Sequence, residues 1–295
     1  MKKIEESIMN FNCLTNVYGL ARSLIALSTL LTLLFNPVHN LFLPMSGIDQ
    51  YPSGNGLFSL FNLVPANYFY LSIVKWFFLI LLLLIIIGWR PRFTGIIHWY
   101  ISYSFYTAAA TLDGGDQVAV ALTFLMIPIT LVDSRKWHWS SINFKNDFSR
   151  IVAIVPYYMI RLQVAIIYLH SFLAKVTREE WINGTAVYYY LQDPLFGLNN
   201  FFLTLVNPIL NSWLVVIPTW GTLIVQLVLF GALFAPKNHW KNYFIVGIFM
   251  HEIFALMLGL FSFSIAMAGA LVLYLVPINE KLNILGGKNE NLKKN

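Results

Sequence analysis

The run Phe77-Phe-Leu-Ile-Leu-Leu-Leu-Leu-Ile-Ile-Ile87 contains eleven consecutive apolar residues. With the residues before it, it extends over 68–87, about the 20 residues that a helix needs to cross roughly 30 Å of hydrocarbon. The chain around it has 295 residues, of which 58% are hydrophobic and 11% charged, whereas a soluble domain carries about 25% charged residues. This composition excludes a soluble globular protein, a disordered chain and a disulfide-stapled secreted domain. It predicts an integral membrane protein.

Apolar runs of this kind recur along the chain and predict an all-α bundle of about eight transmembrane helices in one domain, residues 1–295. The predicted spans are 17–35, 68–87, 94–111, 117–132, 156–174, 213–234, 243–258 and 262–276. The last two depend on dividing one long apolar stretch at Gly259-Leu260-Phe261. Seven or nine spans therefore remain alternatives.

The basic residues predict the orientation of these spans. Of the 19 Lys and Arg residues, 14 lie in loops and ends that the alternation of spans puts on one side, Lys175 and Arg178 lie on the other, and three lie within spans. The positive-inside rule makes the first side cytoplasmic, with both termini there. The net charge of +6 then serves topology and contact with membrane lipid, and we expect no nucleic-acid partner. The 14 residues are Lys2, Lys3, Arg90, Arg92, Arg135, Lys136, Lys145, Arg150, Lys237, Lys241, Lys281, Lys288, Lys293 and Lys294.

Several kinds of chemistry are excluded by what the sequence lacks. The single cysteine, Cys13, allows no internal disulfide, no CxxC redox pair and no cysteine-rich metal site. The sequence contains no P-loop, GxGxxG, HExxH or GxSxG motif, which argues against nucleotide-driven transport and the commonest hydrolases. We expect no metal site.

Charged residues inside a span need a partner or a role, because each costs about 2.5–3.5 kcal/mol at the centre of a membrane helix. His251-Glu252 lies midway along the span 243–258, and Arg22 and Arg161 lie inside the ends of theirs. We expect these four residues to form a buried polar network that shapes a cavity. The alternatives are arginines that extend to the interface and a structural ion pair of Glu252 with an arginine.

A second polar group closes the span 156–174. Ser171 and Lys175 are i, i+4 neighbours on a helix, Tyr168 shares their stripe, and His170 lies beside it. Partly buried His and Lys side chains can be tuned for general acid–base catalysis, so His170 and Lys175 are the catalytic candidates. The alternative is a lysine at the headgroups and a histidine satisfied within the bundle.

Two carboxylates flank the turn Leu112-Asp113-Gly-Gly-Asp116 between the third and fourth spans. They could bind a cation or steady a lysine across the bundle, although two ligands are too few for a calcium loop. The alternative is a tight turn with solvated acids.

Several of these segments together resemble a known family, the HTTM membrane domain that is shared with the vitamin K-dependent gamma-carboxylases. Within it, the chain is most similar to the sporulation-delaying protein B (SdpB) family, and the resemblance covers nearly the whole sequence. The most specific part is the pattern Lys175-x5-Trp181-x2-Gly184. The other parts are Arg22, the Gly88-Trp-Arg-Pro-Arg92 turn, the Gly114-Gly-Asp116 turn and His251.

The resemblance implies maturation of a secreted, bacteriocin-like peptide toxin in the bacterial plasma membrane. The implied partners are the peptide-toxin precursor and a small SdpA-like protein. In the carboxylases a membrane-embedded lysine beside this motif is the base towards vitamin K hydroquinone, so Lys175 would be its counterpart. We also count Asp113 and Asp116 among the catalytic candidates and expect them opposite Lys175 and His170. One alternative is a non-enzymatic toxin immunity or transport component. Another is a quinone- or lipid-linked membrane enzyme, whose cofactor would be that quinone or lipid; the sequence itself requires none.

Overall fold

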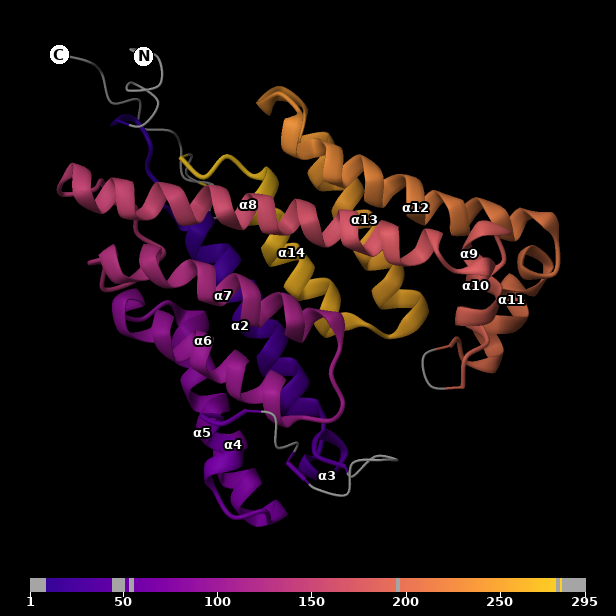
Figure 1. Cartoon of the computed structure of the whole chain (residues 1–295), viewed down its shortest axis with the longest axis horizontal. Coiled ribbons are helices and arrows are strands. Elements are labelled where there is room, and N and C mark those ends of the chain that lie inside the picture. The colour runs from indigo at the N-terminus through magenta and orange to yellow at the C-terminus, as the bar shows by residue number, and fades with distance from the viewer. Residues whose placement is uncertain (1–8, 44–50, 53–55, 195–196, 280–281, 283–295) are drawn as a thin grey trace.

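The computed structural model describes residues 9–43, 51, 52, 56–194, 197–279 and 282, and over these residues the regular elements are all helical. Within these described residues, six helices are long and apolar enough to cross a membrane, which confirms the predicted helical membrane bundle (Figure 1). The number of crossings and the cytoplasmic side stay predictions. Six of the basic residues used to orient the chain lie outside the described residues: Lys2, Lys3, Lys281, Lys288, Lys293 and Lys294.

Each predicted span coincides with a long helix. The long helices are α2 (Asn16–Phe35), α5 (Tyr68–Ile87), α6 (Pro91–Ala108), α7 (Gly114–Val132), α8 (Asp147–Val176), α12 (Val216–Gly231), α13 (Trp240–Leu258) and α14 (Phe261–Leu275). The shorter helices are α3 (Val38–Leu41), α4 (Leu60–Leu63), α9 (Glu179–Ile182), α10 (Ala186–Leu191) and α11 (Asn200–Leu210). Of these, α9 to α11 lie between the predicted spans 156–174 and 213–234.

Helix α8 begins earlier than the sequence predicts. It starts at Asp147 rather than at residue 156 and has 30 residues, or about 45 Å at 1.5 Å per residue. The Asn146 side chain caps it by accepting a hydrogen bond from the Ser149 amide at 2.8 Å. The helix therefore begins nine residues before Pro156, the first residue of the predicted span.

The division between α13 and α14 is confirmed. Gly259 ends α13 with a φ of 71°, a left-handed conformation that glycine adopts without steric cost. The chain turns there, and α14 begins at Phe261.

Helix α14 is the centre of the bundle, although it has only 15 residues. It packs against α2, α7, α8 and α13 (Figure 1). Its approach to α2 depends on Gly269, where an added Cβ would lie 2.8 Å from Ile25 Cγ1 and 3.0 Å from the Ala21 carbonyl oxygen. Small residues allow such close packing of membrane helices. This short helix therefore contacts four of the long helices at once.

One end of the bundle is closed by the loop 133–146 docking on the turn between α5 and α6. Gly88 ends α5 with a φ of 91°, and its carbonyl accepts a hydrogen bond from the His138 amide at 3.0 Å. The His138 ring fills the space beside it, since a Cβ on Gly88 would lie 2.3 Å from His138 Cδ2. The Arg90 amide donates to the Lys136 carbonyl at 2.8 Å. The Gly-Trp-Arg-Pro-Arg turn is thus the surface against which the loop 133–146 packs.

Where this loop meets α2 and α6 lies a buried set of polar residues, which we call the Arg135 cluster: Arg22, Thr94, Asp133, Arg135 and His138. Arg135 forms an ion pair of 2.7 Å with Asp133, and both side chains are 0% exposed. Its Nη1 also donates to three carbonyl oxygens, at 2.6–3.1 Å. Arg22 donates to Thr94 Oγ1 at 2.6 Å and lies 3.4 Å from His138 Nδ1.

The Arg135 cluster holds its histidine neutral. Burial, with the nearby Arg22 and Arg135 cations, lowers the pKa of His138 from 6.5 to about 2. A neutral ring can accept from Arg22 through Nδ1, which a charged ring cannot do. Each buried charge therefore has polar partners, as a membrane-embedded structure requires.

Candidate functional site

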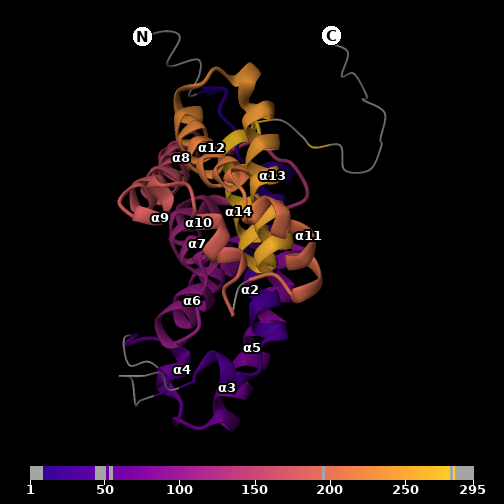
Figure 2. The same cartoon turned by 90° about the vertical axis from the view of Figure 1, so that its right-hand side faces the viewer.

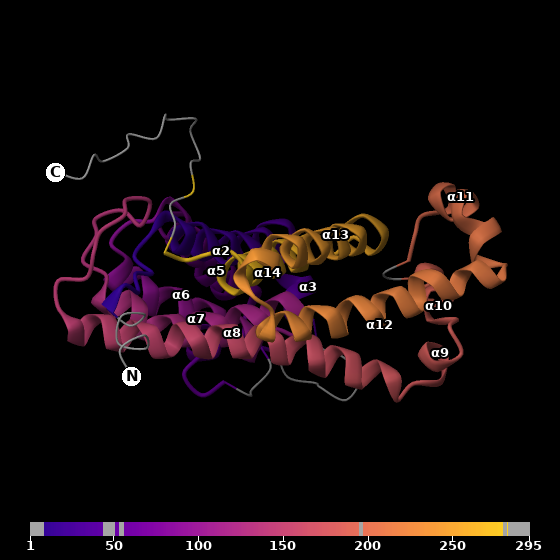
Figure 3. The same ribbon diagram turned by 90° about the horizontal axis from the view of Figure 1, so that it is seen from above.

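At the end of the bundle opposite the Arg135 cluster, a cavity of about 480 Å³ lies among α8, α12, α13 and α14, with α9, α10 and α11 against it. Figure 2 looks onto this end, and Figure 3 shows α8 and α12 running beside each other towards it. Most of its lining is apolar, including three methionines. Its size lies within the range of about 300–1,000 Å³ that is typical of ligand pockets. We call it the Lys175 cavity, and its polar lining consists of Tyr168, Ser171, Lys175, Thr222, Gln226 and His251 together with the ring edges of Trp181 and Tyr190.

One stripe of α8 supplies the first polar residues. Lys175 Nζ donates to Ser171 Oγ at 2.8 Å and to the Ser171 carbonyl oxygen at 3.2 Å. The predicted contact between these two side chains is thereby confirmed. The Lys175 ammonium also lies 5.4 Å from the centre of the Trp181 ring, within the range of a cation–π contact. Among the described residues, no carboxylate lies within salt-bridge distance of Lys175.

Gln226 on α12 contacts the same hydroxyl, and this residue is not among the predicted site residues. Its Nε2 donates to Ser171 Oγ at 3.1 Å, and its side chain is buried, with the residue 3% exposed. Its Oε1 has no hydrogen-bond partner within the described parts of the chain. An amide in the middle of the apolar span 213–234 was the available signal.

His251 closes the inner part of the cavity. Its Nε2 lies 3.0 Å from the Tyr168 hydroxyl, while Nδ1 is buried and unpartnered among the residues described. A buried polar atom without a partner costs about 1–3 kcal/mol. Gln226 and His251, the residues that carry two such atoms, both line the cavity. Each therefore keeps hydrogen-bonding capacity that no described residue uses.

The expected single network of four charged residues is wrong. Arg22 belongs to the Arg135 cluster, and Arg161 Nε donates to the Tyr274 carbonyl at 3.1 Å, with its guanidinium 4.0 Å from the centre of the Trp240 ring. Glu252 is exposed and accepts from Ser264 Oγ at 3.0 Å. Successive helical residues point about 100° apart, so burying His251 turns Glu252 outwards.

Three catalytic candidates lie outside the cavity lining. His170 is exposed on α8, one position off the stripe that carries Ser171. Asp113 and Asp116 form a capping box at the start of α7, in which Asp113 accepts from the Gly115 amide at 2.6 Å and Asp116 accepts from the Asp113 amide at 3.1 Å. Asp113 also accepts from Ser262 Oγ at 2.9 Å. The structure therefore uses these two acids to cap α7 and to contact the start of α14, and neither lines the Lys175 cavity.

The two remaining motif residues shape the wall beside Lys175. Trp181 is 5% exposed and its carbonyl accepts from Trp220 Nε1 at 3.2 Å. Gly184 has a φ of 83°, and an added Cβ would lie 2.8 Å from Val216 Cγ2. Trp181 thus forms one wall of the cavity, and Gly184 allows α12 to approach it.

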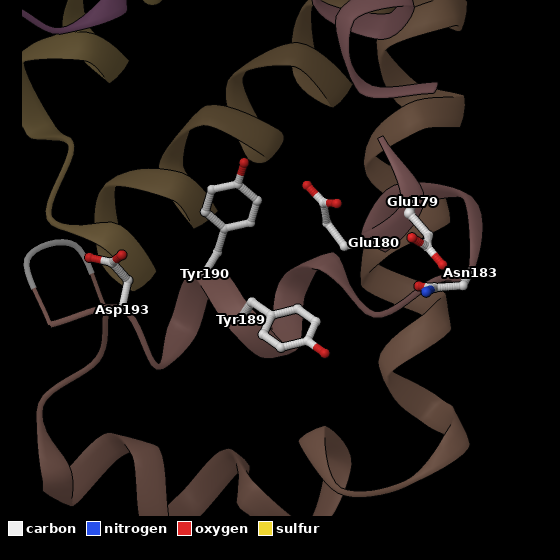
Figure 4. Close-up of a pocket in the computed structure, with 6 residues that line it drawn as sticks. All are labelled: Glu179, Glu180, Asn183, Tyr189, Tyr190 and Asp193. Carbon is white, nitrogen blue, oxygen red and sulfur yellow. The ribbon is translucent and has the colours of Figure 1, made fainter. Parts of the chain in front are cut away.

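A second hollow of about 560 Å³ lies beside α9 and α10. Figure 4 shows Glu179, Glu180 and Asn183 on one side of it, Asp193 on the other, and two tyrosines between them. Tyr190 lines both this hollow and the Lys175 cavity. The two spaces are therefore neighbours across one side chain.

The described residues include no group of three or more His, Cys, Asp or Glu side chains placed to hold a metal ion. Cys13 is buried, and burial raises the pKa of its thiol. The chemistry available at the site is therefore that of a hydroxyl, an amine, an amide, a phenol and an imidazole.

The helical bundle and its mostly apolar cavity define a polytopic membrane protein with a cavity between its helices. The chain is 36% identical to the sporulation-delaying protein SdpB of Bacillus subtilis (strain 168), over 96% of this chain and 88% of SdpB. It belongs to the SdpB family. It is also 52% identical to the protein YitO of the same bacterium, over 96% of this chain and 93% of YitO. No family model matches the chain, and no solved structure matches it.

Proposed function

We propose that this protein takes part in the maturation of a secreted peptide toxin, with the toxin precursor and a small SdpA-like protein as its partners in the bacterial plasma membrane. The observation that carries the proposal is the Lys175 cavity in a member of the SdpB family. A precursor that crosses or enters a membrane presents apolar segments. A mostly apolar cavity with a few polar groups is suited to hold one.

The polar groups of the cavity fit an extended peptide. Gln226 Oε1 and His251 Nδ1 are buried and lack partners in the described chain, and peptide groups of a bound segment can satisfy them. Lys175 lies at the end of the cavity next to α9. We propose Lys175 as the residue that handles protons during maturation and Trp181 as the wall that positions it.

The test follows the secreted peptides of the host cell by mass spectrometry after removal of this protein. We expect one mature peptide to disappear from the medium and its precursor to accumulate in the membrane fraction. Restoring the protein with Met257→Trp, which fills the cavity, should not restore the peptide. The matched control is Leu256→Trp, because Leu256 is 70% exposed on the same helix. An unchanged set of secreted peptides in cells without the protein would contradict the proposal.

A second candidate function, a quinone- or lipid-linked enzyme related through an HTTM domain to the gamma-carboxylases, is favoured by the aromatic and apolar lining around Lys175. It predicts a flat ring molecule or a lipid that co-purifies with the wild type and is lost from Met257→Trp. A non-enzymatic immunity role predicts instead that cells with this protein alone resist added mature toxin. If cells that contain this protein resist the toxin, and cells that lack it still mature the toxin normally, the immunity role is favoured.

A further inference from the structure

We infer that Ser171 and Lys175 form a serine–lysine catalytic dyad that cleaves a peptide bond of the bound precursor. The inference rests on the proposed function and names its reaction, which is hydrolysis of an amide through an ester of Ser171. In this dyad Ser171 is the nucleophile and Lys175 its general base.

The separation of the pair suits transfer of the Ser171 proton to a neutral lysine amine. Ser171 Oγ and Lys175 Nζ are 2.8 Å apart, within the 2.6–3.2 Å that proton transfer from a nucleophile to its base requires. Ser–Lys pairs are one of the recurring variants of nucleophile and base and need no GxSxG turn. Successive turns of α8 carry the two side chains, so the helix fixes their separation.

The surroundings leave the lysine free to act as a base. In the described chain its Nζ contacts the Ser171 hydroxyl and carbonyl and faces the Trp181 ring, with no carboxylate in salt-bridge range. A lysine that only neutralised a charge would have an acidic partner. A lysine that only extended to the headgroups would not line a cavity together with His251 and Gln226.

Gln226 is the positioning residue of the dyad. Its Nε2 donates to Ser171 Oγ at 3.1 Å, which directs the hydroxyl proton towards Lys175. Its Oε1, buried and unpartnered among the described residues, can accept a backbone N–H of the substrate. One amide would thus orient both the nucleophile and the peptide.

The reaction balances with water as the only co-reactant. The neutral Lys175 amine takes the Ser171 proton while Oγ bonds to the carbonyl carbon. The C–N bond then breaks, and the leaving nitrogen takes that proton from Lys175. Water adds to the resulting ester and gives a proton to Lys175; the ester bond breaks, and Ser171 Oγ takes the proton back. The products are one amine and one carboxylic acid.

The first test uses the purified full-length protein in phospholipid nanodiscs and an alkyl fluorophosphonate, which labels activated serines. We expect one adduct per chain, on Ser171, and none in Ser171→Ala. Lys175→Arg keeps a cation but cannot take a proton near neutral pH, so labelling should slow by about 10²-fold. The control Ser264→Ala removes a buried serine bonded to Glu252 instead and should label normally. An unlabelled wild type, or a wild-type rate in Lys175→Arg, overturns the dyad.

The second test separates the dyad from the proposed function in the host cell. Ser171→Ala should abolish production of the mature peptide while the amount of this protein in the membrane stays normal. Ser171→Cys should retain part of that production, and methanethiosulfonate reagents, which modify the new thiol, should block it. The native Cys13 is 0% exposed and gives little background. If removing the protein stops maturation but Ser171→Ala does not, the dyad is wrong and the proposed function stands. If removal changes nothing, both fail.

Discussion

The Arg135 cluster and the Lys175 cavity are both buried polar regions at the ends of one bundle, and they differ in how completely their hydrogen bonds are made. Arg135 bonds to one carboxylate and three carbonyl groups. In the cavity, Gln226 and His251 each keep a buried atom without a partner among the described residues. The five residues of the first region all have partners, whereas the second combines a cavity with two atoms left unpartnered by the described residues.

The difference separates stability from function in this protein. A satisfied buried network rigidifies the structure around it, and here it joins α5, α6 and the loop 133–146 to α2. Unsatisfied polar atoms cost stability, so the cavity residues add little to it. We therefore expect changes in the Arg135 cluster to unfold the protein and changes in the Lys175 cavity to inactivate it.

The largest expected effect is that of Arg135→Leu. It leaves Asp133 charged and buried without its partner, which costs about 3–5 kcal/mol of the free energy of unfolding. Thermal unfolding of the purified protein in detergent, followed by size-exclusion chromatography, measures the loss. The control Arg150→Leu removes the pair with Asp147, whose side chain is 67% exposed, and should cost about 0–1 kcal/mol. Equal melting of the two variants would show that the Arg135 cluster is not the stabilising region.

Gly88→Ala comes next, at about 2–4 kcal/mol. It adds the strain of a left-handed backbone to an overlap with the His138 ring. The matched control is Gly259→Ala, because Gly259 has a φ of 71° but nothing within 4 Å of an added Cβ. It should lose only the strain, about 1 kcal/mol. The same melting assay applies, and a control as unstable as Gly88→Ala would rule out the docking of His138.

A smaller effect is expected from pH. The pKa of His138 is about 2 in the folded protein and 6.5 ordinarily, so below pH 6.5 the unfolded chain binds a proton that the folded chain does not. Stability is therefore full above pH 6.5 and falls with pH, by about 1.4 kcal/mol at pH 5.5 for this group. His138→Gln, which keeps Arg22 and Arg135 and loses the titration, should show a shallower slope between pH 7.5 and 5.5. Parallel slopes would refute the assignment.

The smallest change in stability is expected for Gln226→Leu. It loses one hydrogen bond to Ser171 but also removes the unpartnered Oε1, so the free energy of unfolding should stay within about 1 kcal/mol of the wild type. Toxin maturation should nevertheless be lost, as measured by mass spectrometry of secreted peptides. A large loss of stability would show that Gln226 stabilises the fold, as the Arg135 cluster does, and would contradict its assignment to a binding site.

The sequence predicted the helices and their break at Gly259 because each depends on local properties, namely length, apolar runs and glycine. It also predicted the contact of Ser171 with Lys175, since residues four apart meet on any helix. It could not show that Gln226 joins them, because that depends on α12 packing beside α8. It placed Glu252 inside for the same reason: an adjacent pair of polar residues does not reveal which one faces the bundle. Asp133 and Arg135 were missed as a buried pair because nothing local shows that their loop is covered.

The length of α8 has a consequence for where the reaction would take place. At about 45 Å the helix exceeds roughly 30 Å of hydrocarbon, so it must tilt or project, and hydrophobic mismatch sets the depth of its last turn. Lys175 lies in that turn. A thicker bilayer draws the lysine towards the acyl chains, and a thinner one exposes it to headgroup water. Lipid chain length is thus a means of adjusting the site without changing a residue.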